Sequence, residues 1–217
     1  MENIAALPHL NDVEIRVLGS LIEKSVTTPD YYPMTLNSLT AACNQKSSRK
    51  PVVDYDEETV VLALNGLKAR SLVATAVGAS IRATKYKHNF LTVYPCSEGE
   101  LAVLCLLFLR GPQTPGELNT NSGRLHEFHS LEAVHDVLKQ LATCEPPFVK
   151  ELPKRAGQKE ARFAHLLGDI IENEEEFSIQ EPARRSVNEM EQRIMDLENQ
   201  VAELKEKLDK LMKELLG

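Results

Sequence analysis

The chain has 217 residues, 42% hydrophobic and 26% charged, which allows one or two folded domains with their own cores. The longest apolar run, residues 101–109, is about half as long as a membrane-spanning helix, and the N-terminus lacks a basic region followed by an apolar stretch, so we expect a cytoplasmic protein and no membrane association. The net charge of −7 lies in residues 169–217, because residues 1–93 carry +1 and residues 94–168 carry −1. Both of these earlier parts can therefore present a basic face.

Two helices are predicted near the start of the chain. Asn11 can cap the first of them reciprocally with Glu14 in a capping box. Apolar residues then recur at helical spacing at Ile15, Leu18, Leu21 and Ile22. A second helix is expected to begin at Thr35 and to run to residue 42. The loop that follows it, residues 44–51, is polar and basic, with Lys46, Arg49 and Lys50.

A third helix and a hairpin complete the first part of the chain. Asp56 is expected to be the N-cap of this helix, whose apolar stripe consists of Val60, Leu64 and Leu67. Residues 72–77 are predicted to form a strand, residues 78–80 a turn and residues 81–88 the return strand. The return strand is the most basic short segment of this half, with Arg82, Lys85, Lys87 and His88. Three helices followed by a two-stranded hairpin form the plan of a winged helix.

The same plan recurs in the second part of the chain. A shift of 86 residues places Asn11 on Ser97 and Glu14 on Glu100, and it places Thr28-Pro29 on Thr114-Pro115. Shifts of 74 and 77 align the third-helix stripe with Val134, Leu138 and Leu141, and the return strand with residues 162–165. The second wing tip, residues 153–160, carries Lys154, Arg155 and Lys159. The chain is therefore predicted to contain two winged helices.

A heptad pattern occupies the end of the chain. Apolar residues alternate at spacings of three and four over four heptads, at Val187, Met190, Ile194, Leu197, Val201, Leu204, Leu208, Leu211 and Leu215. Branched residues at the first heptad position with leucine at the fourth favour two parallel strands, so this segment predicts a homodimer. The alternative is a helix that folds back on its own domains.

We therefore predict a mainly α fold with small β-hairpins, of the α+β class. Its parts are a winged-helix domain at residues 1–93, a second winged-helix domain at 94–168, an acidic linker at 169–186 and a coiled coil at 187–217.

Several motifs resemble the YceH family of uncharacterised bacterial proteins. They are Thr27-Thr28-Pro29, Tyr32-Pro33, residues 42–46, Arg49, Pro51-Val52, residues 84–86 and residues 109–118. The likeness covers roughly residues 10–167 and implies a tandem winged-helix fold, but no activity and no catalytic residues. Where many members have arginines after Gly-Glu-Leu, this chain has Asn119 and Asn121 and keeps only Arg124, so the resemblance does not imply an anion-binding role for that segment.

The basic wings and the basic loop are the candidate nucleic-acid contacts. Lysine and arginine neutralise phosphates, so the candidates are Lys46, Arg49, Lys50, Arg82, Lys85, Lys87, Lys154, Arg155 and Lys159. The alternative is a solvated polar hairpin. The third helices begin with carboxylates, Glu57 and Glu58 in one copy and Glu132 in the other, which would repel phosphates. Winged helices that serve as a protein-interaction scaffold are therefore the second hypothesis.

Catalysis is not expected, because the sequence contains no glycine-rich phosphate loop, nucleophile elbow or convincing acid pair. His126, His129 and His135 lack the spacing of a metal site, and the four cysteines show no zinc-type or redox pairing. We therefore expect a non-enzymatic protein without a cofactor or metal.

Overall fold

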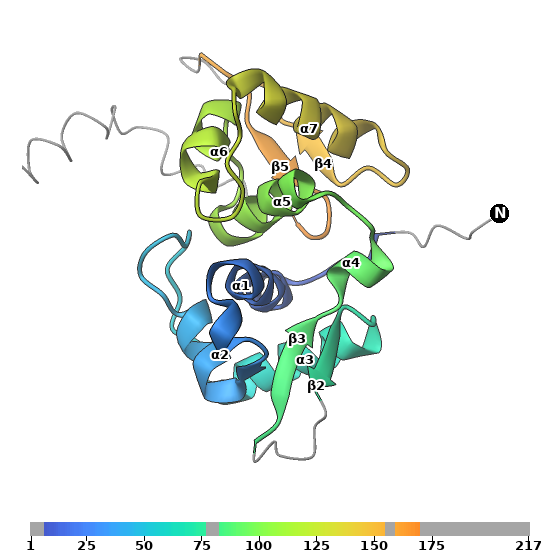
Figure 1. Ribbon diagram of the computed structural model, residues 1–217. Coiled ribbons are helices and arrows are strands. Elements are labelled where there is room, and N and C mark those ends of the chain that lie inside the picture. Colours follow the sequence, from blue (N-terminus) through green and yellow to red (C-terminus); the bar gives the residue numbers. More distant parts are fainter. Residues whose placement is uncertain (1–6, 77–82, 155–158, 170–217) are drawn as a thin grey trace, which may run out of the picture. The chain divides into compact units, whose positions relative to one another are not determined.

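The computed structural model describes residues 7–76, 83–154 and 159–169. The acidic linker and the coiled coil lie outside the described residues. Within them, helices are combined with small antiparallel sheets (Figure 1), which confirms the predicted α+β class.

The first half of the described chain contains three main helices whose starts are fixed by side-chain caps. They are α1 (Asp12–Thr27), α2 (Leu36–Cys43) and α3 (Glu57–Ala69). Asn11 and Glu14 form the predicted capping box on α1. Thr35 and Asp56 each accept a hydrogen bond from the backbone amide three residues on. The predicted caps are therefore confirmed, with Thr35 as the cap of α2 and not its first residue.

A three-stranded antiparallel sheet connects this helical segment to the hairpin. Its strands are β1 (Met34–Thr35), β2 (Val73–Ala76) and β3 (Lys85–His88), in the order β1-β3-β2. The 3₁₀-helix η1 (Pro29–Tyr31) precedes β1, and the short helix α4 (Phe90–Val93) follows β3. The return strand β3 is thus the central strand, held on one side by β2 and on the other by the residues that lead into α2.

The second half repeats this arrangement with a shorter first helix and shorter hairpin strands. They are α5 (Glu98–Arg110), α6 (Pro115–Ser122), α7 (Leu131–Thr143), β4 (Val149–Glu151) and β5 (Phe163–His165). Capping boxes begin α5 at Ser97 and α6 at Thr114, as predicted. The third strand is reduced to one antiparallel bridge between Gln113 and Phe163, which occupies the place of the Met34–Tyr86 pair in the first half.

The internal repeat extends to the register of the hairpins. Val73 pairs with His88 in the first hairpin, and Val149 pairs with His165 in the second. The apolar stripes of α3 and α7 are both buried: Val60, Leu64, Leu67, Val134, Leu138 and Leu141. The alignments with shifts of 74 and 77 residues are therefore confirmed.

One part of the repeat alignment is wrong. Thr114, the cap of α6, corresponds in the structure to Thr35, the cap of α2, and not to Thr28. The reason is that Thr28-Pro29 lead into η1, and that η1 and β1 are inserted before α2 in the first half. A Thr-Pro pair favours the start of any helical turn, so the sequence could not distinguish a short 3₁₀ turn from the helix itself.

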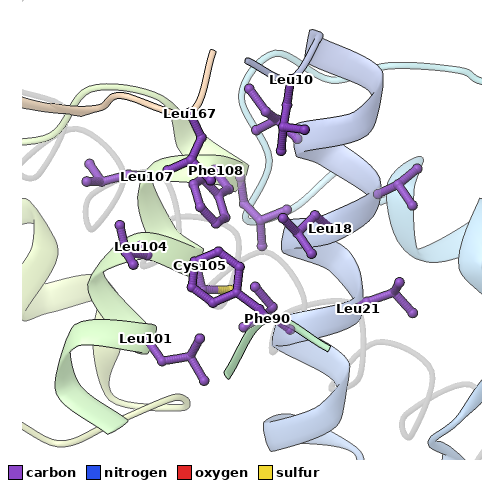
Figure 2. Packing of buried hydrophobic residues seen from close by; sticks show 14 of the residues in the cluster. Leu10, Leu18, Leu21, Phe90, Leu101, Leu104, Cys105, Leu107, Phe108 and Leu167 are labelled. Atoms are coloured by element: carbon purple, nitrogen blue, oxygen red, sulfur yellow. The ribbon is translucent and has the colours of Figure 1, made fainter. Parts of the chain in front are cut away.

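The two halves share one hydrophobic core, in which α1 packs against α5. Leu18, Leu21, Leu104 and Leu107 are fully buried there, and Figure 2 shows how side chains of the two helices meet in this core. The helices approach closely at Gly19, whose carbonyl oxygen accepts a hydrogen bond of 3.5 Å from the Sγ of Cys105. Gly19 and Cys105 are related by the same shift of 86 residues as the caps of α1 and α5, so equivalent positions of the repeat meet in this contact.

Replacing Gly19 by leucine is expected to lower the free energy of unfolding by about 1–3 kcal/mol, because overpacking forces neighbouring side chains and backbone to move. A Cβ at this position would lie 3.0 Å from the Cβ of Phe108 and 3.0 Å from a Cδ of Leu109. Gly123→Leu is the matched control, since a Cβ there meets nothing within 4 Å. Equilibrium unfolding in guanidinium chloride measures both variants, and equal effects at the two positions would contradict the close packing.

A short backbone contact joins the two ends of the described chain. The amide of Leu10 donates a 2.6 Å hydrogen bond to the carbonyl of Leu167, and Leu10 forms a parallel bridge with Gly168. The residues after β5 therefore lie beside the residues that enter α1.

Candidate nucleic-acid interface

The outer face of the first sheet carries two lysines and no acid. Lys85 and Lys87 lie on the same face of β3, because side chains two residues apart in a strand point the same way. Their cross-strand neighbours on that face are Thr35, Ala76 and Ala74. Neither lysine forms an ion pair with the described residues. The two ammonium groups are thus available to an external anion.

The opposite face of β3 holds the sheet against the helices. Tyr86 lies beneath the ammonium of Lys68 from α3, with Nζ 4.8 Å from the ring centroid, and this cation–π contact brings a third cation next to the hairpin. The Nε2 of His88 lies 3.1 Å from the Oγ of Ser25. Burial lowers the pKa of His88 to about 4, so its imidazole is neutral at pH 7 and adds no charge to the hairpin. Lys68 was not among the basic candidates predicted from the sequence. Its position in the last turn of the helix before the hairpin is the one sequence signal that could have indicated it.

The outer face of α3 begins with exposed carboxylates, as the sequence indicated. Asp56 accepts a 2.8 Å hydrogen bond from the amide of Thr59, whereas Glu57 and Glu58 point to solvent. Further along, Leu62 is 67% exposed, which is unusual for a leucine in the middle of a helix that packs on a core.

The structure places Arg49 in the interior, not on the basic loop surface. Its side chain is fully buried, and its guanidinium bonds both carboxylate oxygens of Glu23 at 3.0 and 2.7 Å. The remaining donors bond the carbonyl oxygens of Ala42 and Ser48. Every N–H of the guanidinium is therefore occupied, and Arg49 has no donor left for a phosphate.

Lys46 and Lys50, the other two loop candidates, are exposed. The loop is held against the second half, because the amide of Lys50 donates to the carbonyl of Leu109 at 2.9 Å and Arg110 bonds the hydroxyl of Ser48 at 3.0 Å. This contact between the loop and α5 could not be predicted from the sequence, because the two segments lie far apart in the chain.

The second hairpin is less basic than the first. Lys154 and Lys159 come together, with the Nζ of Lys154 donating to the carbonyl of Lys159 at 3.4 Å. Both lysines are exposed, but so are Glu151 and Glu160 beside them. Arg162 is bound to Glu117 by two hydrogen bonds of 2.8 and 2.7 Å. The second hairpin therefore offers less unbalanced positive charge than the first.

The remaining candidates lie outside the described residues. They are Arg82, Arg155 and the nine heptad residues from Val187 to Leu215.

Within the described part of the chain, no group of three or more histidine, cysteine or acidic side chains is arranged to hold a metal ion. The ring of His126 packs on Phe128 at 4.8 Å. All four cysteines are free thiols, of which Cys43 and Cys105 are buried. Among the described helices, none combines the length and the apolar character needed to cross a membrane.

Comparison with known proteins identifies the family of this chain. The family model described as "Protein of unknown function, DUF480" matches residues 10–158. The chain belongs to this family. Members of a group called UPF0502 proteins are similar to this chain over most of its length. The UPF0502 protein of Geobacter sulfurreducens is 51% identical over 197 residues, which is 90% of each chain. That of Shewanella sp. MR-4 is 44% identical over 215 residues, 93% of this chain and 97% of its own. That of Opitutus terrae is 50% identical over 166 residues, 76% of this chain and 72% of its own. The resemblance to the YceH-type family is thus confirmed.

Proposed function

We propose that the protein is a non-enzymatic, regulatory nucleic-acid-binding protein built from two winged helices. The acid-free face with Lys85 and Lys87 carries this proposal, because free ammonium groups on a wing can neutralise phosphates along a duplex. The element order of three helices and a hairpin, with a third strand beside the return strand, supports the winged-helix assignment in both halves.

Binding is proposed to have weak sequence preference. Base readout by a helix-turn-helix uses the N-terminal part of the recognition helix, and in α3 that part carries Glu57 and Glu58. The wing therefore supplies backbone contacts, with Lys68 beside it, while the start of α3 is kept away from the phosphates by its charge.

Replacing Lys85 and Lys87 by alanine is expected to weaken binding to random duplex DNA and to reduce the log–log salt slope by about 2, since each lost phosphate contact lowers it by about 0.9. Glu57→Gln with Glu58→Gln is expected to strengthen binding by removing repulsion, and it leaves the Asp56 cap intact. Fluorescence anisotropy over a range of salt concentrations measures both effects.

Lys139→Ala with Lys150→Ala is the matched control, because it removes the same charge from exposed positions on α7 and β4. A β3 variant whose slope equals that of the wild type, or a control with the same loss as the β3 variant, would refute the assignment of the wing.

Homodimerisation through residues 187–217 is proposed to raise the affinity of these weak contacts. A dimer presents two copies of each wing, and linked sites bind through effective concentration. Light scattering is expected to give a dimer at micromolar concentration and a monomer after deletion of residues 187–217. A full-length monomer, or a dimer that survives the deletion, would contradict this prediction.

A protein-interaction scaffold is the second candidate function. The observation that favours it is the outer face of α3, where Leu62 is 67% exposed between Glu58 and Asn65, a surface that suits a basic protein better than DNA. A nuclease-insensitive, stoichiometric partner that is lost on Leu62→Glu would support the scaffold.

A further inference from the structure

A small pocket lies where the two halves meet, between α1, α5, β5 and the loop before α3. Its volume is about 120 Å³, room for a compact small molecule. The apolar part of the wall includes Ile15, Leu107, Phe108 and Pro112. Arg16 supplies its buried charged group.

Arg16 is a buried cation that has no carboxylate partner in the part of the chain that the structure describes. The residue is only 4% exposed. Its guanidinium donates two hydrogen bonds to neutral groups, the carbonyl oxygens of Cys43 at 3.3 Å and of Pro51 at 2.6 Å. No acid of the described chain forms an ion pair with it. Burial lowers the pKa of Arg16, which reflects the penalty on its charged form.

Three other arginines of the described chain form ion pairs, and of these Arg49 is fully buried. Arg49 is paired with Glu23, Arg70 with Glu14 at 2.9 Å, and Arg162 with Glu117. A buried charge is normally paired, since leaving it uncompensated is costly. Arg110, which is half-buried, also bonds only neutral groups, Asn121 and Ser48, but it does not line the pocket. Arg16 is more deeply buried and lies at the pocket wall, so the lack of a counter-charge among the described residues is the feature to explain.

The other polar side chains of the pocket include a cation, two carboxylates and two neutral rings. Lys50 adds a second positive charge, and Tyr55 contributes a phenol. His165 lies at the wall with a buried Nδ1 that has no hydrogen-bond partner; His88 has the same feature at the equivalent position of the first hairpin, so this orphaned nitrogen belongs to the repeat. Two carboxylates, Asp12 and Asp169, also line the pocket; both are exposed, and Asp169 lies 3.1 Å from the ring of His9.

We propose that this pocket binds a small organic carboxylate, whose anionic group pairs with Arg16 and whose apolar body packs against Leu107 and Phe108. The carboxylate supplies the counter-charge that no described residue provides, and the planar guanidinium can bond it through two N–H groups at once. The two exposed aspartates disfavour large polyanions, so a compact monoanion is the class of ligand. This proposal is independent of nucleic-acid binding, because it concerns a different surface from the face of β3.

The test uses the full-length chain with isobutyrate as the probe and isobutyramide as its neutral isostere, at constant ionic strength adjusted with sodium chloride. Heteronuclear NMR is expected to show saturable shifts of the aromatic signals of Phe108 and His165 with isobutyrate, at millimolar to tens of millimolar concentration. The melting temperature should rise along the same binding curve, because a ligand that binds only the folded state stabilises it. Isobutyramide should produce neither effect.

Two variants make the test specific. Ala164→Leu adds three carbons at a buried position of the pocket wall and leaves the residue Arg16 itself unchanged, and it is expected to weaken binding at least about tenfold. Arg124→Gln removes an exposed arginine elsewhere and should leave binding unchanged. Equal shifts with the amide, unchanged affinity in Ala164→Leu, or no saturable shift with isobutyrate would overturn the proposal. Inorganic phosphate is a further arm, and tighter binding of phosphate than of isobutyrate would overturn the assignment to a carboxylate.

Discussion

Replacing Arg49 by methionine is expected to lower the free energy of unfolding by about 3 kcal/mol, because it removes the bidentate partner of the Glu23 carboxylate and leaves it only Lys24, whose Nζ lies 3.2 Å away. Glu23 is only 14% exposed in its side chain and loses both of its short guanidinium bonds in this variant. Burial alone would raise the pKa of Glu23, but the hydrogen bonds and the charge of Arg49 outweigh it and hold the pKa below its usual value. The carboxylate is thus kept ionised mainly by the partner that the variant removes, with a smaller contribution from Lys24.

Equilibrium unfolding in urea measures this effect, with the double variant Glu23→Leu with Arg49→Met as the test of mechanism. The double variant should regain part of the loss, since apolar residues replace the buried pair and Lys24 keeps its hydrogen bond to Gln45. Arg124→Met, at an exposed position, should change the free energy of unfolding by less than about 0.5 kcal/mol. A single variant as stable as the wild type would contradict a structural role and would return Arg49 to the candidate phosphate contacts.

Acidification from pH 6.5 to 4 is expected to destabilise the fold through His88 and His165. Burial lowers the pKa of each imidazole to about 4, whereas in the unfolded chain it is about 6.5. The unfolded state therefore binds more protons between these values, so the stabilising contribution is complete above pH 6.5 and is lost as the pH falls to about 4. The loss is on the order of 3 kcal/mol for His165 and less for His88, which is less completely buried.

The free energy of unfolding, measured at pH 7.0 and 4.5, tests this prediction. The variant His88→Gln with His165→Gln should show a smaller difference between the two pH values than the wild type. His129→Gln with His135→Gln, at exposed positions, should keep the full difference. An unchanged pH dependence in the hairpin variant would show that other groups cause the acid response.

Local features of the fold could be predicted from the sequence because their signals are local. The caps at Asn11, Asp56, Ser97 and Thr114 need only residues three positions apart, and the buried stripes of α3 and α7 follow helical spacing. The equivalence of Thr35 and Thr114 could not be seen in the same way. Because η1 and β1 are inserted in the first half, these two caps are offset by seven residues fewer than the 86 that relate the caps of α1 and α5.

The candidate site was only partly predictable, because the fate of a charge depends on partners far away in the chain. Lys85 and Lys87 were found from their alternation in a strand, and the structure leaves them without an ion pair among the described residues. Arg49 has the same sequence signature but meets Glu23, 26 residues earlier. Arg16 stands in the apolar run of α1, and only the packing of α5 and β5 onto that helix places it at a pocket.

The most direct measurement of the proposed function is a titration of the full-length protein into fluorescently labelled random duplex DNA at about 50 mM salt, repeated at rising salt. We predict saturable binding that weakens with salt, with a log–log slope of about −2 or steeper, which corresponds to at least two neutralised phosphates. Absence of binding at about 50 mM salt, or binding that does not respond to salt, would contradict the account.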